Sequence, residues 1–98
     1  NNLMQNVLIR TSFLELDLSF NEIKFSVSKI IVDRTKISYL NLASINLTNF
    51  LFDNEFKLSS FINVISINLS FNFITSLERN TFLMNQNLKI LDLSHNLI

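Results

Sequence analysis

The chain of 98 residues contains no cysteine, glycine, proline or tryptophan. Without cysteine it has neither a disulfide framework nor a thiolate metal site, and its single histidine, His95, cannot build a histidine metal centre alone. Tight hairpins and helix C-caps commonly use glycine or proline, so a fold with many such turns is disfavoured. An AT-rich coding sequence would deplete the same residues without any structural reason.

Charge of one sign and long apolar runs are also missing. Eight Lys and Arg balance eight Asp and Glu, so no basic surface for nucleic acid is indicated. No apolar run exceeds three residues, which excludes a bilayer-spanning helix or a signal-peptide core within this segment. The hydrophobic content of 48% is too high for a disordered chain. The sequence therefore predicts one small domain or a piece of a larger one.

A repeat organises what is present. Residues 13–23, 37–47, 64–74 and 88–98 read FLELDLSFNEI, ISYLNLASINL, VISINLSFNFI and LKILDLSHNLI, with starts 24, 27 and 24 residues apart. Each segment is apolar at its first, fourth, sixth and eleventh places. Asparagine occupies the ninth place in three of them, as Asn21, Asn72 and Asn96, and the second segment has Ile45 there, with Asn46 next to it.

The repeated segments predict short parallel strands. Apolar and polar residues alternate in the middle of each segment, which is the period of a strand with one buried face. We expect in-register strands at residues 15–18, 39–42, 66–69 and 90–93, with one buried column formed by Leu16, Leu40, Ile67 and Leu91. The ninth-place asparagines then form a buried ladder that hydrogen-bonds the backbone of each turn. The alternative is that they are ordinary surface loop residues.

This pattern resembles the leucine-rich repeat family, whose consensus is L-x-x-L-x-L-x-x-N-x-L. The 24-residue period, with Leu77 and Phe82 at the fourteenth and nineteenth places, is similar to the extracellular subclass found in Toll-like receptor ectodomains. The resemblance implies an α/β-type solenoid that is mostly β, a right-handed coil with a parallel concave sheet and an irregular convex side. The whole chain, 1–98, would be one such segment of a longer solenoid: a partial repeat 1–12, repeats 13–36, 37–63 and 64–87, and a partial repeat 88–98.

The second repeat departs from the pattern. It carries three extra residues before Val64, so we expect its outer loop to bulge, with a helical turn within residues 53–60. Phe56 is expected to take the role of Phe82 between strand and outer wall. In the first repeat Ile30, Ile31 and Val32 replace the phenylalanine. These residues are interpreted as core fillers, and a ligand pocket built from them is the alternative.

For function, the resemblance implies a protein-recognition module without enzymatic activity or cofactor. It would be part of an innate-immune receptor ectodomain, extracellular or at the cell surface. A ligand or partner protein would bind through the concave face or the solenoid edge, with no nucleic acid and no membrane contact. End-to-end or edge association is also expected, because an open solenoid end lacks a neighbour. The alternatives are an extracellular adhesion or structural protein and a cytoplasmic scaffold.

The candidate site residues are those that flank the buried leucines. They form a mixed, slightly acidic strip, and an ordinary solvated sheet face is an equal alternative: Glu15, Asp17, Tyr39, Asn41, Ser66, Asn68, Lys89, Ile90 and Asp92. Phe20 and Phe71 follow the strands and are expected to pack over neighbouring turns rather than form a contact patch. Asn46 and Asn68 begin N-glycosylation triplets, and Asn46 is expected to be the better acceptor.

No residue set in the sequence predicts catalysis or a metal. Asp17 and Asp92 would lie roughly 14 Å apart across the sheet, too far for a carboxylate pair. Ser94 and His95 lie near Asp92, but nothing in the sequence forms a nucleophile elbow or an oxyanion hole. His95 is therefore interpreted as a surface histidine.

Overall fold

The computed structural model describes residues 8–10, 14–21, 33–45 and 57–98 of the chain, the first of these ranges by its backbone only. In this part the fold is mostly β, with two short 3-10 turns, and no helix in it is long and apolar enough to cross a bilayer. The elements are β1 (Leu8–Arg10), β2 (Glu15–Asp17), η2 (Arg34–Lys36), β3 (Tyr39–Asn41), η4 (Leu58–Ser60), β4 (Ser66–Asn68) and β5 (Ile90–Asp92).

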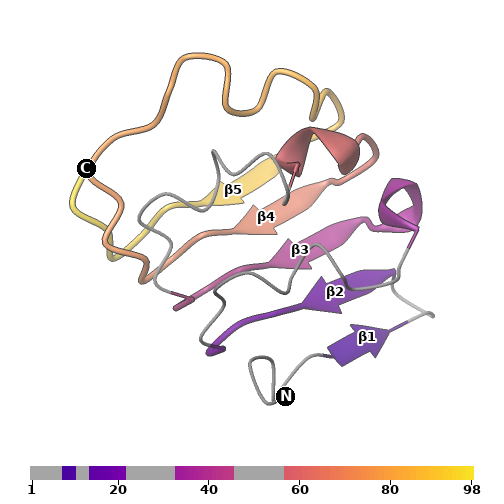
Figure 1. The fold of residues 1–98 in the computed structure, drawn as a ribbon, viewed down its shortest axis with the longest axis horizontal. Helices are drawn as coiled ribbons and strands as arrows, with labels where there is room; N and C mark the ends of the chain where they lie inside the picture. The colour runs from indigo at the N-terminus through magenta and orange to yellow at the C-terminus, as the bar shows by residue number, and fades with distance from the viewer. Residues whose placement is uncertain (1–7, 11–13, 22–32, 46–56) are drawn as a thin grey trace.

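The five strands form one sheet in chain order, and β2 to β5 are parallel (Figure 1). The register pairs Leu16 with Leu40, Leu40 with Ile67, and Ile67 with Leu91. The predicted strands, their direction and their central column are therefore confirmed. Leu91 is only half-buried, because β5 is the edge strand and has no described neighbour on its other side.

Each parallel strand ends one residue earlier than expected, at the polar fifth place of its segment. There the side-chain Oδ1 accepts the backbone N–H two residues ahead, for example Asp17 from Ser19 at 2.9 Å and Asn68 from Ser70 at 2.9 Å. Such an Asx turn bends the backbone out of the extended conformation. The strand therefore stops as soon as this side chain is reached.

The partial repeat expected at residues 1–12 falls within the described residues only at β1, the one strand of the described sheet that is not parallel to its neighbour. β1 pairs antiparallel with β2, with Ile9 opposite Leu16. Only residues 11–14 connect the two strands, and a parallel pair needs a crossover of a dozen or more residues. The short connection therefore requires a hairpin, and Leu14, with φ of 52°, contributes a left-handed turn residue to it.

The core lies against one face of the sheet. Leu16, Leu18, Leu40, Leu42, Ile67 and Leu69 alternate inward along β2 to β4 and beyond, and Leu77 and Phe82 pack partly buried against them. Behind the strands, Leu58 and Phe61 are also buried. Counted back from the following strand, Leu58 stands where Phe82 stands in the next repeat. Phe56 and the expected loop bulge lie outside the described residues, and of the expected helical turn only η4 falls within them.

Candidate functional site

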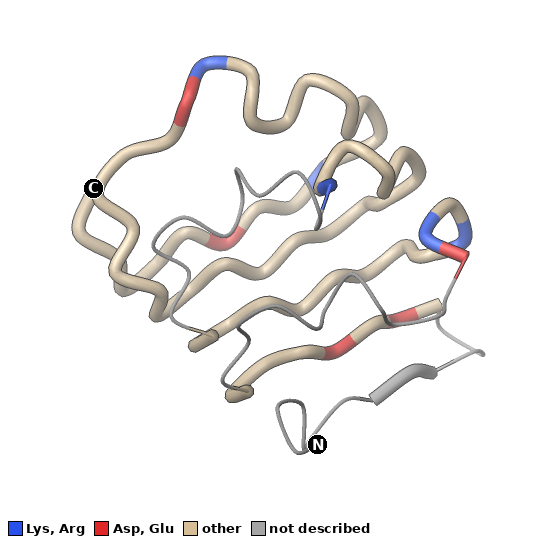
Figure 2. The backbone as a smooth tube through the Cα atoms, viewed as in Figure 1, with Lys and Arg blue, Asp and Glu red and all other residues tan. Residues whose placement is uncertain are grey.

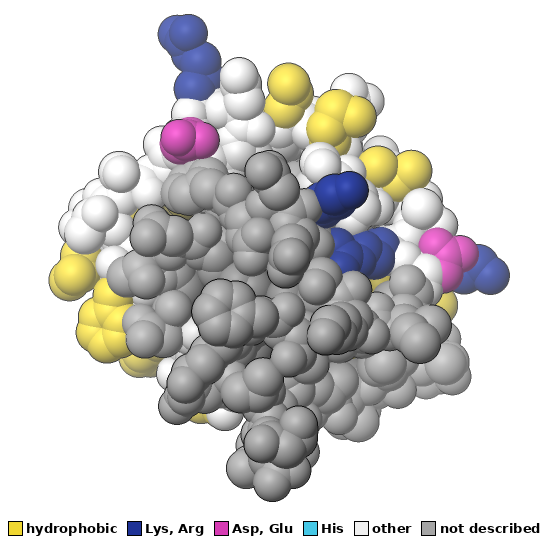
Figure 3. All heavy atoms as spheres, viewed as in Figure 1, with side chains coloured by type: hydrophobic (Ala, Val, Ile, Leu, Met, Phe, Trp, Pro, Cys, Tyr) yellow, Lys and Arg dark blue, Asp and Glu magenta, His cyan; other side chains and the backbone are white. Residues whose placement is uncertain are grey.

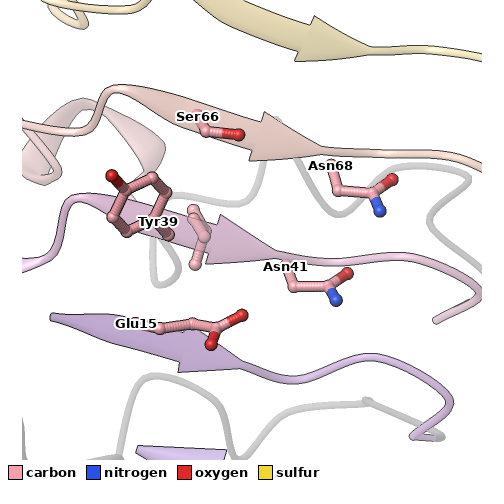
Figure 4. A pocket seen from close by; sticks show the side chains of 6 residues that line it. Glu15, Tyr39, Asn41, Ser66 and Asn68 are labelled. Carbon is pink, nitrogen blue, oxygen red and sulfur yellow. The ribbon is translucent and has the colours of Figure 1, made fainter. Parts of the chain in front are cut away.

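Five of the nine predicted binding residues meet on the sheet face opposite the core. Together with Leu40 they line a hollow of about 370 Å³ over β2, β3 and β4 (Figure 4): Glu15, Tyr39, Asn41, Ser66 and Asn68. The in-register pairing places Glu15, Tyr39 and Ser66 in one row across the strands. The same pairing places Asn41 beside Asn68, and Figure 4 shows their side chains lying parallel.

The other four candidates do not line this hollow. Asp17 lies on β2 beyond Glu15, and Ile90 and Asp92 lie on the edge strand β5, with Lys89 just before it. Ile90 is well exposed, with 58% of its surface accessible. Apart from Lys89, the predicted strip therefore forms two rows of positions across the sheet, and only their β2–β4 part is hollowed.

The asparagines of the hollow present donors rather than acceptors. Asn41 Oδ1 accepts the N–H of Ala43 at 3.1 Å, and Asn68 Oδ1 accepts both the N–H and the hydroxyl of Ser70, at 2.9 and 2.7 Å. Their Nδ2 groups remain for a ligand. Tyr39 and Ser66 add two hydroxyl groups, and Glu15 adds the one carboxylate among the lining residues. This set of donors and hydroxyl groups suits a neutral polar ligand that offers acceptors, such as a peptide backbone, and the Glu15 carboxylate disfavours a phosphate.

The fifth-place residues have a structural role that the sequence interpretation missed. Asp92 holds its turn as Asp17 and Asn68 do, with Oδ1 accepting the N–H of Ser94 at 2.9 Å and its hydroxyl at 2.6 Å. These hydrogen bonds, and to a smaller extent the charge of His95, hold the pKa of the Asp92 carboxyl below its ordinary value. The signal was in the sequence, because three of the four segments have serine two residues after this polar place.

Buried asparagine side chains connect the turns behind the sheet. Asn72 is fully buried: its Oδ1 accepts the N–H of Ile45 at 2.8 Å, and its Nδ2 donates to the carbonyls of Leu42, Leu69 and Ser70 at 2.8, 3.0 and 3.1 Å. The Asn72 side chain therefore bonds its own turn and the turn before it.

Asn96 repeats this arrangement one turn later. Its Oδ1 accepts the N–H groups of Asn72 and Ile74 at 2.9 and 3.0 Å, and its Nδ2 donates to the Leu69 carbonyl at 3.0 Å. Asn21 is buried and donates to the carbonyls of Leu18 and Ser19, both at 3.1 Å. In the second segment Ile45 is buried and takes part in this hydrogen bonding only through its backbone N–H. Asn46 lies outside the described residues.

The burial of the polar residue Asn85 was not predicted. Its Nδ2 donates to the carbonyls of Leu58 and Phe61 at 3.2 and 3.1 Å, and its Oδ1 is buried without a partner among the described residues. Asn85 stands three residues before Leu88, as buried Phe61 stands three residues before Val64. The shared place in the repeat could have identified Asn85 as buried. The correspondence is hard to see in the sequence, because one segment has an aromatic residue there and the next has an amide.

The expectation that Phe20 and Phe71 pack over neighbouring turns is wrong for Phe20 and only partly right for Phe71. Their exposed fractions are 71% and 51%, and Phe71 stacks on His95 with ring centroids 4.2 Å apart. Hydrophobic side chains are visible at the margin where the strands end, at the left of Figure 3. The backbone of both residues is left-handed, with φ of 58° and 60°. This conformation directs their side chains away from the core.

The described residues offer no group of three or more acidic, histidine or cysteine side chains placed to hold a metal ion. The Ser94 hydroxyl donates to Asp92, and the His95 ring lies against Phe71. The neighbouring Ser94, His95 and Asp92 therefore lack the serine-to-histidine contact that activates a nucleophile.

Comparison with known proteins does not assign the chain to a family. No protein-family model, no curated protein and no solved structure matches it. The repeat, the parallel register and the hollow are therefore the observations on which a functional proposal can be based.

Proposed function

We propose that this chain is part of a leucine-rich-repeat solenoid and serves as a protein-recognition module. It would belong to the ectodomain of a receptor of the innate-immune Toll-like type, outside the cell or at its surface. A ligand or partner protein binds on the concave face, which is the sheet face opposite the core, and the module performs no catalysis. The recurring segment of 24 to 27 residues supports the family proposal.

The geometry of the repeats supports the proposal independently of the resemblance. Each 11-residue segment supplies one short parallel strand, one Asx turn and, in three cases, one asparagine that bonds the turn. Stacked units of one design, each contacting its sequence neighbours, are the arrangement of repeat proteins. Stacking in one direction creates an elongated surface, which suits an extended contact with another protein.

The hollow at Tyr39 is the observation that carries the functional proposal. Its residues come from three strands and from separate repeats, yet they converge on one place. Tyr39 is 43% exposed although its ring is large, and tyrosine is among the residues that most often anchor protein interfaces. The surrounding amide and hydroxyl groups provide directional hydrogen bonds.

A selection experiment tests whether this face is the preferred recognition surface. A displayed library of random peptides is selected on the wild-type chain, and each binder is then measured on the Tyr39→Ala, Ser66→Arg double variant. We expect most binders to lose about tenfold or more in affinity, because the anchor is gone and a charge fills the hollow.

The control variant is Arg79→Ala. Arg79 is exposed in the connection between β4 and β5 and does not line the hollow. Binders should retain their affinity for this variant. If most binders tolerate the double variant and respond to Arg79→Ala instead, the hollow is not the recognition surface.

A further inference from the structure

The eighth place of each segment forms a second row, separate from the hollow. Phe20, Ser44, Phe71 and His95 occupy it, and all four have a left-handed backbone, with φ of 58°, 53°, 60° and 56°. The N–H groups of the first three donate to the carbonyls of Ala43, Ser70 and Ser94, one strand further along, at 2.9, 3.0 and 3.2 Å. The four residues therefore stand on consecutive rungs in the same conformation, and their Cα–Cβ bonds leave the backbone in similar directions.

The residues in this row adopt a backbone conformation that is energetically unfavourable for their residue types. A left-handed conformation is unfavourable for any residue with a Cβ and is an outlier for a bulky one, and the chain contains no glycine that could adopt it freely. Phe20 and Phe71 also remain largely exposed, so burial does not offset the strain. Exposed aromatic rings held in strained positions are a reason to look for a binding role.

One pair of side chains on neighbouring rungs of this row is stacked. The rings of Phe71 and His95 lie 4.2 Å apart with an interplanar angle of 6°. Ser44, on the rung between Phe20 and Phe71, carries no ring. Rungs of a sheet are spaced by ~4.8 Å, so the two phenylalanine positions are separated by roughly 9.6 Å. A planar group above Ser44 would lie ~4.8 Å from each ring, within the range of stacked aromatic contacts.

We propose that the guanidinium group of an arginine side chain from a partner protein occupies this position, stacked between Phe20 and Phe71 above Ser44. A guanidinium is flat and cationic, and it is attracted to the faces of aromatic rings. The Ser44 hydroxyl, for which the described residues provide no hydrogen-bond partner, accepts one of its N–H groups. This inference rests on the proposed recognition function and names one chemical feature of the partner.

The charges of the described residues favour a cation over a neutral ring. Asp17 is the last residue of β2 and so lies at the end of the sheet from which Phe20 follows, whereas Arg34 and Lys36 belong to η2, which precedes β3 and lies at the opposite end of the strands (Figure 2). Asp92 occupies the equivalent place on β5, two strands beyond Ser44. An aromatic side chain would fill the same position but would gain nothing from these carboxylates.

The test uses N-acetyl-arginine amide as the probe and NMR shifts of the Phe20 and Phe71 ring protons as the readout. We expect saturable shifts of both rings, with the corresponding lysine and tyrosine amides binding several-fold more weakly. Ser44→Phe completes the row of rings and should weaken arginine binding by roughly tenfold. Ser76→Phe adds a ring at an exposed serine outside the row, so it is the matched control and should retain binding.

The proposal is wrong if Ser44→Phe, with an otherwise unchanged spectrum, binds arginine amide as the wild type does. It is equally wrong if arginine, lysine and tyrosine amides shift the two rings alike, if tyrosine amide binds best, or if none of them shifts the rings. The peptide selection tests the proposed recognition face separately, because it probes Tyr39 and Ser66, which are not in this row.

Discussion

At the scale of single residues, the buried asparagine amides form backbone hydrogen bonds that a leucine of similar size cannot form. Asn72 bonds the Ile45 N–H and the Leu42 carbonyl of the preceding turn, besides two carbonyls of its own turn. Buried backbone groups that lose such partners are strongly destabilising. The amide therefore fixes the distance between neighbouring turns as well as the shape of one turn.

The Asn72→Leu substitution measures this role. It leaves several buried backbone groups without partners, and we expect the free energy of unfolding to fall by roughly 2–5 kcal/mol in urea titrations. Asn80→Leu is the control, because Asn80 is exposed and its side chain makes no hydrogen bond to a described residue; its effect should stay within about 0.5 kcal/mol. Equal destabilisation by the two substitutions would show that the amide contacts are unimportant.

The carboxylates that begin the turns predict a dependence of stability on pH. Hydrogen bonds from Ser94 lower the pKa of Asp92 from 3.8, and hydrogen bonds from Thr35 lower the pKa of Asp33 from the same value. Because the folded-state pKa values are lowered, this stabilisation is present above pH 3.8 and is lost as the pH falls through the folded-state values.

Replacing both carboxylates by amides removes the titration and keeps the turn acceptors. The Asp33→Asn, Asp92→Asn double variant should match the wild type in its urea midpoint at pH about 6 and lose less stability than the wild type at pH about 2.5. Asn68 already performs this role at the equivalent place of β4, so the fold should tolerate the change. A parallel acid loss in both proteins would assign the pH dependence to other groups.

At the scale of elements, the strands were predictable and the hairpin was not. Alternation around Leu16, Leu40 and Ile67 repeats in phase, so periodicity alone placed the parallel strands. Leu8–Arg10 has no such repeat to support it, and its pairing depends on the length of its connection to β2. The exact strand ends depend on Asx hydrogen bonds, which a hydrophobic pattern does not record.

The candidate site, too, was predictable from the sequence only in part. The outward places of the strands follow directly from the two-residue period, so the residues of the hollow could be named from the sequence. Which of them would converge could not, because the hollow depends on the size of each side chain and on its register with the neighbouring strand. The left-handed φ of Phe20 and Phe71 was also hidden, since no glycine marks those positions.

Hydrogen exchange should distinguish the inner strands from the edge strand. The N–H groups of Leu42 and Leu69 each donate to the next strand at 2.8 Å, whereas the equivalent N–H of Leu93 has no partner in the described part of the chain. We expect the Leu93 amide to exchange about tenfold or more faster than the other two. Comparable protection of all three would mean that the edge of β5 is covered by another segment or another chain.

At the scale of the whole molecule, the exposed edge of β5 favours association. Ile90, Leu97 and Ile98 are exposed by 58%, 65% and 68%, next to the edge of β5 that pairs with no other described strand. Such an edge is a template for another strand. Sedimentation velocity should show self-association that grows with concentration and weakens in the Leu97→Lys, Ile98→Lys variant. A single monomeric species at every concentration, in both proteins, would contradict this expectation.

The central claim is that repeated segments pair in parallel and in register, and a cross-strand disulfide tests it most directly. The chain has no native cysteine, so one introduced pair reports one contact. Tyr39 lies opposite Ser66 and points to the same sheet face, and such neighbours fall within the Cα separations that a disulfide requires. The pair Tyr39→Cys with Asn68→Cys is offset by two residues, about 8 Å apart.

Under mild oxidation, mass spectrometry should find the Tyr39→Cys, Ser66→Cys disulfide formed readily and the offset disulfide formed poorly. Preferential formation of the offset disulfide would contradict the register, and with it the stacked-repeat account.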